Sequence, residues 1–148
     1  MSRRRCIWSH VLDERVREVR VVVRDRFGRN PGERSFWVLP EHEAEFRDFC
    51  EHGLRYGPRF FGLLVLSLVV LLAGAALAVT GSTRLGLTLA GGSMVFQGLL
   101  IWRYPFSTPE TVQMLGVARS IRVVRALGIV NIVMGFLVMA LDRLLPRV

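Results

Sequence analysis

The side chains best suited to chemistry are the thiols and imidazoles near the start of the chain. Cys6, His10, Cys50 and His52 are all competent zinc ligands. Zinc is held by four nitrogen or sulfur ligands in a tetrahedron, usually as close pairs along the chain. Three residues separate Cys6 from His10, but only one separates Cys50 from His52. We therefore interpret Cys50 as a core residue and the histidines as solvated, with a zinc site or a redox sensor as the alternative.

Catalytic patterns are missing from the sequence. It contains no Ser-His-Asp set, no phosphate-binding glycine-rich loop and no dinucleotide fingerprint. His42 and Glu43 begin a segment similar to a metalloprotease helix, which needs a second histidine four residues after the first. Phe46 stands at that position. We therefore predict a protein that is not an enzyme and has no cofactor.

A second group of candidate residues lies within apolar stretches. Helices in lipid associate through small residues and polar contacts, and the residues of this kind are Ser93, Gln97, Gly128, Asn131 and Gly135. At about 1.5 Å rise per residue, Gln97 and Asn131 lie at the same depth, roughly 8–9 Å from the cytoplasmic edge. We predict a hydrogen bond between their side chains. The alternative is that Ser93, Gln97 and Asn131 face a transport path, as polar residues within membranes often do.

These residues sit in a chain dominated by apolar blocks. The 148 residues are 51% hydrophobic, and an apolar block of about 20 residues is long enough to span a ~30 Å hydrocarbon core. The blocks predict transmembrane helices at about 60–80, 85–102 and 126–145. The fold class is thus an α-helical integral membrane protein, with a head at 1–58 and a membrane domain at 59–148.

The head has the pattern of two strands followed by a helix. Val19, Val21 and Val23 alternate with Arg20, Val22 and Arg24, which indicates a strand. Residues 35–39 form a second short strand, with Phe36 and Val38 on one face. The segment 41–52 has helical periodicity and an acidic first turn, and Gly53 is a natural stop. We predict a small ββα head.

Residues 103–125 separate the second and third apolar blocks. Ser107, Thr108, Pro109 and Glu110 form a typical helix start, and we expect an amphipathic helix along the membrane surface with a kink at Gly116. Arg119, Arg122 and Arg125 share one side of this helix. Together with Arg103 they are expected to contact anionic lipid headgroups, each worth about 1 kcal/mol near the surface.

The distribution of arginine predicts the orientation. All basic residues are arginine, and the formal net charge is +8. Arginines flank one end of the apolar blocks, at Arg55, Arg59, Arg103, Arg119, Arg122 and Arg125, whereas the other end has Arg84, Arg143 and Arg147. The positive-inside rule places the head in the cytoplasm and the C-terminus outside. The absence of lysine suggests GC-rich coding, so we expect a bacterial inner membrane.

The functional prediction is a non-enzymatic accessory or scaffold subunit. Residues 1–59 mix 13 arginines with 10 acidic residues, which is not the concentrated basic stripe that nucleic-acid binding needs. We expect the partners to be the anionic bilayer and either a membrane protein or further copies of the chain. A small oligomeric transporter or permeability factor is the first alternative, and a metal- or redox-sensing membrane protein is the second.

Overall fold

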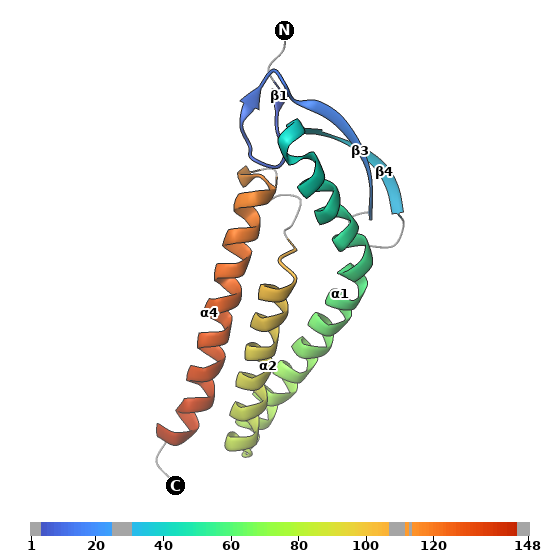
Figure 1. Cartoon of the computed structure of the whole chain (residues 1–148). Coiled ribbons are helices and arrows are strands. Elements are labelled where there is room, and N and C mark those ends of the chain that lie inside the picture. Colours follow the sequence, from blue (N-terminus) through green and yellow to red (C-terminus); the bar gives the residue numbers. More distant parts are fainter. Residues whose placement is uncertain (1–3, 25–30, 107–111, 113, 145–148) are drawn as a thin grey trace. The chain divides into compact units, whose positions relative to one another are not determined.

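The computed structural model describes residues 4–24, 31–106, 112 and 114–144 (Figure 1). The chain forms two compact units. The head unit comprises Met1–Arg59 and Phe106–Val123, and the span unit comprises Phe60–Pro105 and Val124–Val148. The expected linker at 103–125 is therefore grouped mostly with the head.

The head unit contains two antiparallel strand pairs. β1 (Arg4–Arg5) pairs with β2 (Leu12–Asp13), and β3 (Arg17–Arg24) pairs with β4 (Pro31–Val38). In the longer pair Val19 lies opposite Phe36. Val19 is 3% exposed while Val22 is 42% exposed, so the alternation predicted from the sequence is confirmed for this hairpin.

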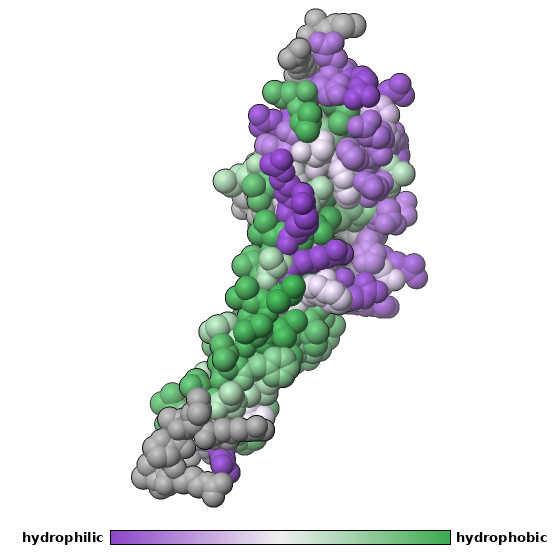
Figure 2. Space-filling view, turned by 60° about the vertical axis from the view of Figure 1, so that its left-hand side comes forward, coloured by the Kyte–Doolittle hydropathy of each residue, from purple (hydrophilic) through white to green (hydrophobic). Residues whose placement is uncertain are grey.

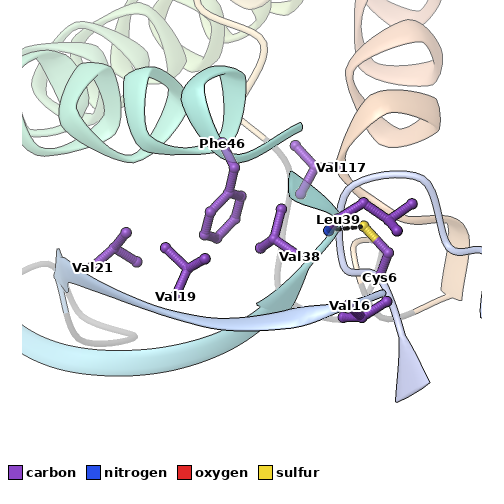
Figure 3. Close-up of a cluster of buried hydrophobic side chains, with 8 residues drawn as sticks. All are labelled: Cys6, Val16, Val19, Val21, Val38, Leu39, Phe46 and Val117. Atoms are coloured by element: carbon purple, nitrogen blue, oxygen red, sulfur yellow. Dashed lines mark hydrogen bonds between the residues drawn. The ribbon is translucent and has the colours of Figure 1, made fainter. Parts of the chain in front are cut away.

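The hydrophobic core of the head lies between the β3–β4 hairpin and the first turns of α1 (Figure 3). Phe46 of α1 packs edge-to-face on Phe36 of β4, with ring centroids 5.4 Å apart. Cys6, Val38, Leu39 and Val117 complete the buried cluster around them. Val117 joins this core from a segment more than 70 residues later in the chain, which ties the expected linker to the head.

The first long helix continues where the sequence predicts a stop. After a short 3-10 turn (η1, Pro40–His42), α1 runs without interruption from Glu43 to Val79. The prediction that Gly53 ends the helix is wrong. Glycine in a helix costs only about 1 kcal/mol relative to alanine, a cost that this long helix tolerates. Pro58 also lies inside α1, so the helix accepts the loss of one N–H donor.

The span unit is built from three apolar helices. α1, α2 (Thr83–Arg103) and α4 (Val117–Leu144) are each long and apolar enough to cross a membrane. On the face shown in Figure 2, the lower part of the molecule is mostly hydrophobic. The second predicted span agrees closely with α2. The third predicted span, from about Ala126, lies within α4, which begins earlier, at Val117.

Candidate functional site

Glycines bring the spans into backbone contact. A Cβ built at Gly91 of α2 would lie 2.6 Å from the carbonyl oxygen of Gly135 in α4, and one at Gly98 would lie 2.5 Å from the carbonyl oxygen of Gly128. On the other side of α2, a Cβ at Gly74 of α1 would lie 2.9 Å from the carbonyl oxygen of Gly86. Gly128 and Gly135 are thus at a helix contact, as expected. Their partners Gly91 and Gly98 were missing from the predicted set.

Ser93 and Asn131 both make hydrogen bonds between helices. Asn131 Nδ2 donates to the main-chain carbonyl of Met94 at 3.0 Å, so the expected bond to Gln97 is wrong. Gly98, one turn after Met94, has no side chain to cover that carbonyl. Ser93 Oγ donates to the carbonyl of Ser67 in α1. Gln97 is half-buried.

The candidate metal ligands Cys6, His10, Cys50 and His52 all lie in the head unit. Cys6 is fully buried, and its sulfur accepts a hydrogen bond from the Leu39 N–H at 3.3 Å. Burial raises the pKa of the Cys50 thiol to about 11. The ring of His52 lies 4.5 Å from that of Tyr56. Across the described ranges, no group of three or more His, Cys, Asp or Glu residues is placed to hold a metal ion.

The start of α4 is capped by the N-terminal loop of the head. The first N–H groups of a helix have no partner within it. Here Val117 donates to the carbonyl of Ile7 at 3.0 Å and Ala118 donates to that of Trp8 at 3.1 Å. Gly116 precedes them with φ at +77°, so the helical path is interrupted at the glycine where a kink was expected. The helix start expected at 107–110 lies outside the described residues.

The segment of the expected surface helix contributes to the core of the head. Val117 is 1% exposed and Ser120 is fully buried. Ile121 and Val112 pack against the same core. Residues 117–121 therefore turn their apolar side to the core of the head, and contact of this segment with a membrane stays a prediction. The hydroxyl of Ser120 donates to the Gly116 carbonyl at 2.7 Å and closes the first turn.

The four arginines predicted to contact lipid are all exposed: Arg103, Arg119, Arg122 and Arg125. Three of them occupy the first turns of α4, and Arg103 ends α2 with its guanidinium 5.2 Å from the ring of Tyr104. Exposure leaves their charges accessible to anionic groups. Their contact with lipid headgroups stays a prediction.

Comparison of the chain with protein-family models, with curated proteins and with solved structures finds no match. The functional conclusion therefore depends on the contacts described above. Two of them bear on it most directly: the glycine contacts of α2 and the hydrogen bonds of Ser93 and Asn131.

Proposed function

We propose that the chain is a non-enzymatic membrane scaffold, an accessory subunit that packs beside another membrane protein or beside further copies of itself. The supporting observation is that the spans bury few of their residues against one another and leave large apolar side chains on their outer faces. In the most apolar 18-residue stretch of α2, one third of the residues are buried. The corresponding share is 11% in α1 and in α4. The outer faces carry large apolar side chains such as Val65, Leu72, Phe136 and Leu137. These faces suit contact with lipid or with the spans of a partner.

The hydrogen bonds within the spans favour a scaffold over a transporter. A transport path needs polar side chains that are free to meet a solute. Ser93 and Asn131 instead donate to carbonyls of neighbouring helices. A polar side chain that bonds to another helix contributes to packing. The two residues therefore support an interpretation in which polar groups hold the helices together.

We expect Asn131→Leu to destabilise the spans without changing permeability. The loss of its bond to Met94 should lower the free energy of unfolding by about 0.6–2 kcal/mol. Unfolding in dodecyl sulfate, followed by circular dichroism, gives the stability, and solute efflux from liposomes gives the permeability. Gln97→Leu is the matched control, and it should have the smaller effect on stability. Altered efflux with unchanged stability would favour the transporter.

The thiols support a structural role over sensing. Metal binding and oxidation both require the thiolate. The raised pKa of Cys50 keeps its thiol protonated at neutral pH, and Cys6 is enclosed in the core. We propose that neither cysteine senses metal or oxidant. A change in the circular dichroism of the head on adding zinc or peroxide would contradict this.

We further propose that the head faces the cytoplasm of a bacterial inner membrane, with the exposed arginines of α2 and α4 among anionic headgroups. The positive-inside rule supports this orientation. Trypsin should then cleave the head in inverted vesicles and spare it in right-side-out spheroplasts. The opposite pattern of protection would reverse the proposed topology.

A further inference from the structure

A pocket of about 210 Å³ lies on the head, outside the residues that carry the proposed function. It is bounded by the N-terminal loop, by β4 and by the segment before α4. Its walls include Arg5, Ile7, His10, Ser35, Trp37 and Val112. All of these belong to the head unit. The lining is thus mostly apolar, and Arg5, His10 and Ser35 are its polar residues.

The basic side of the pocket is formed by Arg5 and His10. The guanidinium Nη1 of Arg5 lies 3.5 Å from Nε2 of His10. In this contact the guanidinium donates and the imidazole nitrogen accepts, which leaves four further N–H donors on Arg5. His10 thus holds a guanidinium that can donate to an anion in the pocket.

The surrounding charges reinforce this positive potential. Arg20 is registered opposite Ser35, so the two side chains share a face of the hairpin. The guanidinium of Arg4 lies 3.5 Å over the ring of Trp37. Two acidic residues lie on that face, Glu18 opposite Trp37 and Glu33 opposite Val22. Their charges are outnumbered by those of Arg4, Arg5 and Arg20.

The backbone holds His10 at the pocket in an unfavourable conformation. His10 has φ at +63°, and residues that retain such a conformation are concentrated at functional sites. Its N–H donates to the Cys6 carbonyl at 2.8 Å, and the Cys6 N–H donates to the Val11 carbonyl at 2.9 Å. This tight loop fixes the position of the imidazole beside Arg5.

From this geometry we propose that the pocket binds a phosphate group, carried by a small phosphoester or by an anionic lipid headgroup. The planar fork of arginine matches phosphate oxygens in a two-point hydrogen bond. The hydroxyl of Ser35 supplies a further donor. Ile7 and Trp37 offer an apolar wall for the organic part of the ligand. Anion binding here goes beyond the scaffold role.

The test uses the full-length chain in phosphatidylcholine nanodiscs. Glycerol 3-phosphate is titrated in and binding is followed by calorimetry. In a second arm, phosphatidic acid replaces part of the lipid and the melting temperature of the head is measured. Both arms are repeated with Arg5→Gln and with His10→Asn, since asparagine tolerates positive φ. The matched control is Arg17→Gln, which removes one exposed charge of β3 outside the pocket.

We expect saturable binding that weakens at least tenfold in Arg5→Gln and His10→Asn and less than twofold in Arg17→Gln. Binding of glycerol 3-phosphate in the first arm identifies a soluble phosphoester as the ligand. A higher melting temperature with phosphatidic acid in the second arm alone, with the same dependence on Arg5, identifies a lipid headgroup. Absence of binding in both arms, or equal losses in Arg5→Gln and Arg17→Gln, would overturn the proposal. Circular dichroism verifies that each variant is folded.

Discussion

Gly91→Leu is expected to separate α2 from α4. A Cβ at Gly91 would lie 2.6 Å from the Gly135 carbonyl oxygen and 3.1 Å from the Met139 backbone nitrogen. Backbone atoms in a packed helix cannot turn aside as a flexible side chain can. Overpacking of this kind costs about 1–3 kcal/mol, occasionally more. The variant should therefore unfold at a lower fraction of dodecyl sulfate in mixed micelles.

Gly92 supplies the matched control for this prediction. It follows Gly91 in the same helix, and a Cβ built there has no atom within 4 Å. Gly92→Leu makes the same change in side chain and in helix propensity, so the difference between the two variants isolates the contact with α4. Equal destabilisation by the two substitutions would contradict the glycine contact between α2 and α4.

Gly116→Ala is expected to loosen the head. At φ of +77° an L-residue is disfavoured by about 1–2 kcal/mol. The added Cβ would also lie 2.9 Å from the Trp8 carbonyl oxygen, the acceptor for the Ala118 N–H. Displacing the loop would weaken two hydrogen bonds, each worth about 0.5–1.5 kcal/mol. We expect a total loss of about 2–5 kcal/mol, measured by thermal unfolding that is followed by the near-ultraviolet circular dichroism of the head.

A substitution at Gly81 serves as the comparison that separates the cost of the positive φ from the cost of the steric clash. It has φ of +106°, but a Cβ there has nothing within 4 Å. Gly81→Ala therefore tests the unfavourable φ alone and should destabilise less than Gly116→Ala. If the two substitutions cost the same, the contact between Gly116 and the Trp8 loop contributes nothing to stability.

Local patterns predicted much of the fold. The alternation around Val19 and Val21 identified a strand, and the apolar block at 85–102 identified α2. Both signals are local, because burial on one face of a strand or all round a helix determines the residue types in sequence order. Gly116 was recognisable for the same reason, since a lone glycine in a helical segment favours a bend.

Long-range contacts explain what the sequence did not predict. The residues after Gly116 have the periodicity of an amphipathic helix, and that pattern is the same whether the apolar side meets lipid or protein. The loop at Ile7 and Trp8 holds the start of α4 against the head. The sequence of this loop has no periodicity from which that contact could be predicted. The predicted hydrogen-bond partner of Asn131 was wrong for a related reason. Counting residues from the membrane edge matches side chains at the same depth, whereas the acceptor is the main-chain carbonyl of Met94.

The assembly state of the chain in its own membrane is the most direct test of the scaffold. The full-length protein would be extracted gently, its native mass measured and the co-purifying chains identified. We predict a particle heavier than one 16.8 kDa chain, containing a stoichiometric membrane partner or several copies. Substituting serine for Leu72 and Phe136 on the outer faces should reduce that mass while the helices remain folded. A homogeneous monomer without a partner would contradict the scaffold proposal.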